Sequence, residues 1–116
     1  MFRPFSYWNT STPSVSFTNA YAVYNPPTSN TTTTLSGSVT IVGVSASFRA
    51  FCYSSTGSPV STNISVGGSG RYIGSSGIGT YVSSYFTLSP GTYSYSVQFY
   101  NLDIQICNGG MEYTQP

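Results

Sequence analysis

Few residues of this chain could perform acid–base or nucleophilic chemistry. The 116 residues include no histidine, and the only side-chain carboxylates and thiols are those of Asp103, Glu112, Cys52 and Cys107. Acid–base catalysis at neutral pH needs a histidine or a tuned pair of carboxylates, and a cysteine nucleophile needs a histidine partner. Glu112 falls in residues 108–116, which we expect to form a C-terminal tail that does not fix it opposite Asp103, as a glycosidase would require. The sequence therefore predicts a protein that is not an enzyme and has no catalytic residues.

Sites for metals, cofactors and nucleic acids are not expected either. A metal site needs clustered histidine, cysteine or carboxylate ligands, and the acids and thiols are dispersed in the sequence. The glycine-rich segment Gly67–Gly70 is followed by no helix or lysine, so we interpret it as a loop and not as a phosphate site. Lysine and arginine together number only 3. Since binding to nucleic acid depends on several such cations, we expect no nucleic-acid partner and no cofactor.

The low charge of the chain favours association with other protein subunits. Only 4% of the residues are charged, against about a quarter in ordinary soluble domains. The net charge of +1 gives little self-repulsion. Hydrophobic residues make up 39% of the chain and aromatic residues 16%, which favours a folded domain over a disordered chain. We expect partners that are copies of this chain or proteins of a capsid or filament.

The sequence also bears on location. No run reaches 18 apolar residues, and the first residues lack the apolar region of a secretory signal, so we expect neither membrane insertion nor signal-directed export. An abundance of Ser, Thr, Tyr, Gly and Asn is typical of adhesins, pilus subunits and virus coats. A virion protein, made in the cytosol and released by lysis, satisfies both observations. We therefore expect the virion surface, with an extracellular or cell-surface location as the alternative.

From Ser36 onward the sequence has the pattern of β-strands. Apolar and polar residues alternate with a period of two, and glycine, proline and serine mark turns. In one segment Ala46, Phe48, Ala50 and Cys52 share a face that we assign to the core. Such short strands favour an antiparallel β-sandwich over residues 36–107, with a closed barrel as the alternative and no helix.

The alternation changes phase near the C-terminus. Apolar residues lie on one parity up to Phe99, and Leu102, Ile104 and Ile106 lie on the other. One residue is therefore inserted at Asn101, where we favour a bulge in a strand that continues to residue 107 over a turn between two strands.

The first 35 residues differ from the rest, and we predict an extended N-terminal anchoring arm and linker over residues 1–35. Prolines interrupt the segment and exclude a series of central strands. Only Ser14–Tyr24 could supply one or two short strands, and Thr31–Thr34 is interpreted as linker. The arm is rich in aromatic side chains, which need a partner that buries them. We expect an assembly interface of Phe2, Phe5, Tyr7, Trp8 and Phe17; the alternative is that the arm supplies the sandwich's own first strand.

The segment Leu88–Val97, LSPGTYSYSV, resembles the corner before the penultimate strand of bacterial and phage immunoglobulin-like domains. There a leucine enters the core, Pro-Gly makes the turn and a tyrosine begins the next strand. The resemblance implies an immunoglobulin-like β-sandwich in which Tyr93 bonds back to the backbone a few residues upstream. The alternative is that Tyr93 and Tyr95 are simply large strand residues. Trp8 precedes both cysteines, which is not the order of an antibody-type domain.

The separation of Cys52 and Cys107 is compatible with the bridge between the sheets of such sandwiches, and two cysteines of an extracellular chain normally pair. Cys107, however, has the opposite parity from Leu102, Ile104 and Ile106. In a reducing cytosol both cysteines would be buried or terminal thiols. A disulfide and two free thiols therefore both stay open.

These patterns predict a non-enzymatic structural assembly subunit, namely a virion (phage) capsid decoration, fibre or spike protein. The alternative is an extracellular carbohydrate-binding or adhesin module, or a surface filament subunit. Tyrosine among many serines, glycines and asparagines is typical of contact surfaces, and aromatic rings can stack on sugars. A ligand or partner surface is therefore expected from the tyrosines that core packing does not use, with five candidates: Tyr53, Tyr72, Tyr81, Tyr85 and Tyr100.

Overall fold

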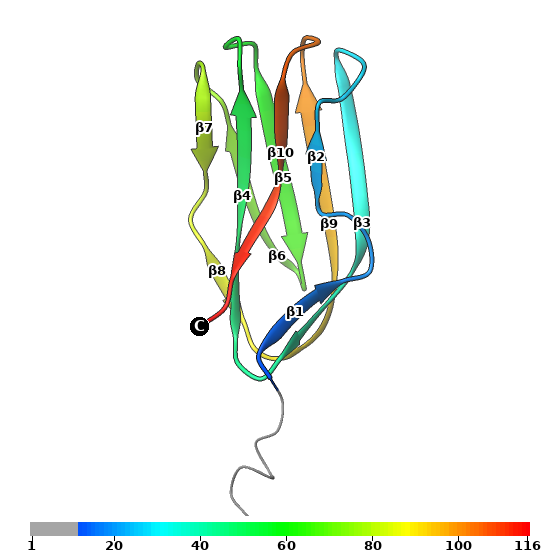
Figure 1. The fold of residues 1–116 in the computed structure, drawn as a ribbon, viewed down its shortest axis with the longest axis vertical. Helices are drawn as coiled ribbons and strands as arrows, with labels where there is room; N and C mark the ends of the chain where they lie inside the picture. The colour runs from blue at the N-terminus through cyan, green and yellow to red at the C-terminus, as the bar shows by residue number, and fades with distance from the viewer. Residues whose placement is uncertain (1–11) are drawn as a thin grey trace, which may run out of the picture.

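Ten β-strands and no helix make up residues 12–116, the part of the chain that the computed structural model describes (Figure 1). One sheet has the order β1-β3-β9-β5-β6, with the bounds Ser14–Phe17, Thr31–Val42, Gly91–Asn101, Val60–Val66 and Ser69–Gly74. The other has the order β2-β10-β4-β7, and β8 also pairs with β4; the bounds are Ala22–Tyr24, Cys107–Thr114, Ala46–Ser54, Gly79–Val82 and Phe86–Leu88. All of these strand pairs are antiparallel. The prediction of an all-β, antiparallel fold is therefore confirmed.

The core lies between the two sheets. Successive side chains of a strand point to opposite faces, so every second residue of the long strands can be buried. On β4 the buried hydrophobic residues are Ala46, Phe48, Ala50 and Cys52, as predicted, and Ser54 is buried on the same face. They pack with residues of the facing sheet and of β10: Val39, Ile41, Ile64, Val66, Tyr95, Val97, Phe99 and Met111. The two layers thus form a sandwich-like arrangement whose interior holds two apolar clusters.

Two tyrosines of β9 fix the chain around this core. The Tyr93 hydroxyl donates to the carbonyl oxygen of Ser89 at 2.7 Å, the upstream backbone bond that the resemblance implies. The Tyr95 hydroxyl lies 2.7 Å from the carbonyl oxygen of Asn19 and 3.0 Å from that of Ala20. Tyr95 therefore holds the segment between β1 and β2 against the middle of the molecule.

The structure corrects the predicted start of the sandwich. Residues Ser14–Phe17 pair with the end of β3, and Ala22–Tyr24 pair with β10, so these segments belong to the sandwich itself. The interpretation of Thr31–Thr34 as linker is wrong, because β3 begins at Thr31 and pairs with β9 along its length. Threonine is β-branched and fits a pleated strand well, which explains this outcome.

The predicted end of the chain is also wrong. Strand β9 ends at Asn101, so this residue is not a bulge, and residues 102–106 form a loop instead of a strand. Residues 108–116, expected to be a tail, contain most of β10. This strand lies between β2 and β4 and pairs with β4 from Cys107 opposite Ser54 to Thr114 opposite Ser47. The C-terminal segment is therefore a central strand of its sheet.

The predicted assembly residues divide into two groups. Phe2, Phe5, Tyr7 and Trp8 lie outside the described residues. Phe17 lies in β1 and packs against its own core, with its ring centre 4.0 Å from that of Tyr21 and 5.5 Å from that of Tyr95. Phe17 therefore contributes to the packing of the sandwich.

Candidate functional site

An open groove of about 470 Å³ crosses the outer face of the β2-β10-β4-β7 sheet. On its floor Arg49 of β4 lies opposite Glu112 of β10, and Phe51 lies opposite Gly110. These residues face outward because they alternate with the buried Phe48, Ala50 and Met111. We call this surface the β10 groove; it is lined by Tyr21, Tyr24, Arg49, Phe51, Tyr85, Met111, Glu112, Tyr113 and Thr114.

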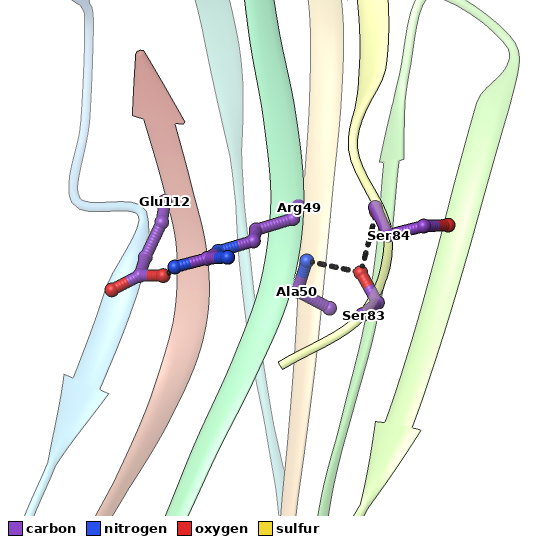
Figure 2. A network of polar contacts seen from close by, with 5 residues as sticks. All are labelled: Arg49, Ala50, Ser83, Ser84 and Glu112. Carbon is purple, nitrogen blue, oxygen red and sulfur yellow. Dashed lines mark hydrogen bonds and ion pairs between the residues drawn. The ribbon is translucent and has the colours of Figure 1, made fainter. Parts of the chain in front are cut away.

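An ion pair occupies the middle of the β10 groove. Arg49 Nε donates to Glu112 Oε1 at 2.8 Å, and the two side chains are 29% and 42% exposed (Figure 2). The Arg49 guanidinium carbon also lies 4.6 Å from the centre of the Tyr85 ring, within the range of a cation–π contact. Partly exposed pairs contribute only about 0–1 kcal/mol to stability. The pair therefore contributes little to the stability of the fold, and it places ordered polar groups in the groove.

The segment between β7 and β8 places Tyr85 beside Arg49. The Ser83 hydroxyl accepts the Ala50 backbone N–H at 2.9 Å (Figure 2). The Ser83 N–H also donates to the Ala50 carbonyl at 2.9 Å. From the other sheet, Arg71 donates to the Tyr85 carbonyl at 3.2 Å and to Ser84 Oγ at 3.1 Å. These bonds hold the segment against the edge of β4.

Only two of the five tyrosines predicted to form a ligand or partner surface share a face. Tyr53 lies on the outer face of β4 and Tyr85 lines the β10 groove. Tyr72 is exposed on β6 of the other sheet, and Tyr81 packs against the core beside Cys52. Tyr100 bonds to Asn30 Oδ1 at 3.0 Å at an end of the other sheet. The candidates therefore do not form one surface.

Of the residues that line the groove, only Tyr85 was among those predicted to form a ligand or partner surface; Tyr24, Phe51 and Glu112 are among the residues that the sequence did not assign to it. Phe51 was recognisable from its parity, which is opposite to that of Phe48. Tyr24 and Glu112 were not, because their places depend on the pairing of β10 with β2 and β4. The Arg49–Glu112 bond joins residues 63 positions apart, so no local sequence pattern predicts it.

The two cysteines are free, buried thiols on neighbouring strands of one sheet. Cys107 lies opposite Ser54 and Cys52 lies opposite Gly109, so the cysteines are diagonal neighbours. Diagonal neighbours lie about 7 Å apart, whereas the Cβ atoms of a disulfide lie about 4 Å apart. The interpretation as a bridge between the sheets is therefore wrong, since both cysteines belong to the same sheet. Burial raises the pKa of Cys52 to about 11 and also raises the pKa of Cys107.

Raising the pH above 9 is expected to destabilise the protein through Cys52. The unfolded thiol ionises from its ordinary pKa of 9.0, whereas the folded thiol stays neutral up to a pKa of about 11. Its contribution to the free energy of unfolding is thus complete below pH 9 and is lost as the pH rises to about 11. Urea unfolding at several pH values should show a shallower loss for Cys52→Ala than for the unchanged chain. Equal slopes would contradict this assignment.

The side chains that could perform acid–base or metal chemistry are kept apart. Asp103 lies in the loop 102–106 and accepts a hydrogen bond from Ser58 Oγ at 3.0 Å, while Glu112 lies in β10 beside Arg49. Within residues 12–116, no three His, Cys, Asp or Glu side chains gather where they could hold a metal ion. The groove thus offers aromatic faces and hydrogen-bonding groups.

A second surface lies at the end of the molecule where four loops meet, residues 25–30, 55–59, 75–78 and 102–106 (Figure 1). Backbone hydrogen bonds join them, including Asn30 N–H to the Leu102 carbonyl at 2.9 Å and Leu102 N–H to the Pro59 carbonyl at 3.1 Å. We call this surface the apolar end because it carries four exposed aliphatic side chains: Ile78 (70% exposed), Leu102 (40%), Ile104 (68%) and Ile106 (66%).

In the loop 102–106 the polar side chains of Gln105 and Asp103 bond to neighbouring segments of the chain. Gln105 Oε1 accepts hydrogen bonds from Ser54 Oγ and Thr56 Oγ1, both at 3.0 Å, and Gln105 Nε2 donates to the Ser58 carbonyl at 3.2 Å. The aliphatic side chains between these polar residues face solvent. The loop is thus held in a defined conformation that exposes its apolar residues.

Comparison with known proteins gives no relative. No protein-family model, curated protein or solved structure matches the chain. Over residues 12–116 there is no helix of the length and apolar character needed to cross a membrane. What the chain does must therefore be inferred from the geometry and chemistry of its own residues.

Proposed function

We propose that the chain is an immunoglobulin-like β-sandwich that serves as a non-enzymatic structural assembly subunit: a virion decoration, fibre or spike protein. The two antiparallel sheets and the bond from Tyr93 to the Ser89 carbonyl support the immunoglobulin-like assignment. The observation that carries the assembly role is the apolar end.

The apolar end has the properties of a protein contact surface. Exposed apolar groups that lie together mark sites of interaction, whereas single exposed residues need no explanation. Here three of the four aliphatic residues lie in one five-residue loop, and Gln105 and Asp103 fix that loop through bonds to the neighbouring loop 55–59. A surface that is ordered before binding loses less conformational entropy when a partner covers it.

The proposed role includes a location. We place the subunit at a virion surface, with a cell surface as the alternative.

The position of the apolar end suits a subunit attached at its other end. The described chain begins at Thr12, beside the β1–β3 end where Ser14 pairs with Val42, and the apolar end lies at the opposite end of the strands (Figure 1). The aromatic residues Phe2, Phe5, Tyr7 and Trp8 precede this start in the sequence. With these residues as an anchor at one end and the apolar end against a neighbouring subunit at the other, the subunit would be held at both ends, so the loss of either contact should reduce incorporation.

The state of the reactive side chains supports a role without catalysis. Cys52 and Cys107 are buried, and their raised pKa values keep them in the protonated, non-nucleophilic form at neutral pH. Asp103 and Glu112 lie on different surfaces, so they do not form the facing pair that glycoside hydrolysis uses.

Sedimentation of particles from the cells or virus that produce the chain tests the assembly role. The unchanged chain is expected to sediment with a particle or filament, and immunogold electron microscopy should label that particle at regular positions. The double variant Ile104→Ser/Ile106→Ser should keep its thermal midpoint and incorporate at least 10-fold less. Tyr72→Ala, which alters an exposed residue on another surface, should incorporate normally. An unchanged chain found only as a free monomer would overturn the proposal.

A deletion tests the anchoring arm. Removing residues 1–30, the arm without its linker, would also remove β1 and β2, so the informative deletion stops at residue 11. Residues 12–116 contain all ten described strands and should give a folded, soluble domain that no longer sediments with the particle. Normal incorporation of residues 12–116 would show that the aromatic residues at the start of the chain are not the anchor.

A further inference from the structure

We propose that the β10 groove binds a neutral oligosaccharide. The binding groups would be the rings of Tyr24 and Tyr85 and the polar atoms of Arg49 and Glu112. This site lies on a different surface from the apolar end and does not depend on the assembly role.

The aromatic rings stand on opposite sides of the groove. Tyr24 belongs to β2 and Tyr85 to the segment before β8, with β10 and β4 between them. Three strand spacings of about 4.8 Å separate these positions by about 14 Å across the sheet. The faces of aromatic rings are negative, so they attract the weakly positive C–H groups on the face of a sugar ring. Because one sugar ring cannot contact both tyrosines, the spacing indicates a chain of several sugar units.

Both rings are accessible to such a chain. Tyr24 is 67% exposed, and Tyr85 remains 40% exposed although Arg49 lies over its ring. Phe51 lies between them on the floor of the groove, opposite Gly110, which is buried where the backbone of Tyr21 and Ala22 approaches β10. Each of the two rings therefore has surface that a ligand can contact from solvent.

The ion pair provides the polar contacts. Within the described residues, the hydrogen bonds of the pair use only Arg49 Nε and Glu112 Oε1. The two Nη groups of Arg49 and Oε2 of Glu112 are therefore a set of donors and an acceptor for a ligand. Sugar hydroxyls both donate and accept, so they match both partners. Since the two charges compensate each other, the groove favours neither an anionic nor a cationic ligand.

The topology favours a ligand held by side chains over a peptide strand. A peptide that extends a sheet needs a free backbone edge. The floor of this groove is the face of paired strands, because β10 pairs with β4 on one side and with β2 on the other. The groove also contains one carboxylate, Glu112, whereas glycoside hydrolysis uses two. The chemistry expected here is therefore binding without cleavage.

An array of immobilised neutral oligosaccharides tests the proposal, with α- and β-linked glucose, galactose, mannose and N-acetylhexosamine chains as probes. Acidic alginate and heparin fragments and an unrelated peptide library serve as comparisons. The full chain should bind at least one neutral probe. Calorimetric titration with that probe should show at least a 10-fold loss of affinity for Tyr24→Ala and for Tyr85→Ala. The matched control Tyr72→Ala, which alters a tyrosine of the other sheet that is 64% exposed, should bind normally.

Three results would overturn the site: binding to none of the neutral probes, preferential binding to the acidic fragments or peptides, or equal affinity of the two groove variants and the unchanged chain. Far-UV circular dichroism of each variant excludes misfolding as the cause of lost binding. A failure here would leave the sedimentation of the assembly subunit unaffected, so the two proposals are tested separately.

Discussion

Truncation after Cys107, which removes residues 108–116, should leave a chain that does not fold. The deleted residues contain all of β10 except its first residue, and β10 is the strand that joins β2 to β4. The deletion would expose one flank of β4 at the seven positions that pair with Asn108–Thr114 and remove the buried Met111 from the core. Natural domains are stabilised by only about 5–15 kcal/mol, so the loss of a central strand exceeds what the rest can compensate.

Thermal unfolding followed by circular dichroism would measure this result. The unchanged chain should show one cooperative transition with a β-sheet spectrum, and the truncated chain should show none. The matched control ends at Thr114. It loses the bonds from Gln115 Nε2 to the carbonyls of Val42 at 2.9 Å and Val44 at 3.0 Å but keeps β10. That variant should fold with a modestly lower midpoint. A cooperative transition in the chain that ends at Cys107 would show that folding does not need residues 108–116, as expected of a tail.

The alternation of apolar and polar residues predicted some strands correctly and gave a wrong prediction for another segment. It succeeded for β4, where both faces are clear and the apolar one is buried. It failed for residues 102–106, because the period of two indicates that side chains alternate and does not indicate which set faces inward. There Gln105 and Asp103 bond to loop 55–59, and the isoleucines face solvent. Bonds between distant loops decide that orientation, and they have no local signature.

Two further segments were not predicted to be strands, because their residue types usually indicate linkers or tails. The run Thr31–Thr34 has no apolar member, so it looked like linker, although alternate threonines are half-buried in β3. The pair Gly109-Gly110 falls in the segment that was predicted to be a C-terminal tail. In the structure these glycines lie where other chain segments approach β10 most closely: a Cβ at Gly110 would lie 2.5 Å from the Tyr21 carbonyl oxygen. Glycine can mark flexibility or close contact, and only the tertiary structure distinguishes them.

The β10 groove was beyond sequence reasoning for the same reason. Arg49 could be assigned to the outer face of its strand, and the two acids were recognised as the only carboxylates. Their roles depended on whether residues 108–116 form a strand, and that in turn depended on pairing between residues more than 50 positions apart. A pattern within one strand carries no information about which strand lies next to it.

The substitution Gly109→Ala is expected to destabilise the protein strongly. A Cβ at this position would overlap the Phe99 ring and lie 2.5 Å from Thr62 Oγ1. Phe99 and Thr62 are both fully buried in the facing sheet, so neither can move without disturbing the core. Overpacking of this kind typically costs 1–3 kcal/mol. Because the overlap here is with a ring and a hydroxyl together, we expect a loss of about 3 kcal/mol in the free energy of unfolding.

Urea unfolding of four variants would establish the cause. Gly70→Ala is the matched control, because Gly70 lies on the edge strand β6 and its Cβ would lie 3.3 Å from the Ile64 carbonyl oxygen. This variant should change the free energy of unfolding by less than about 1 kcal/mol. Phe99→Leu alone should destabilise by a smaller amount than Gly109→Ala. The double variant Gly109→Ala/Phe99→Leu should then lose less than the sum of the single losses, because the smaller side chain removes the overlap. Additive losses would show that contact with the Phe99 ring is not the reason why position 109 needs glycine.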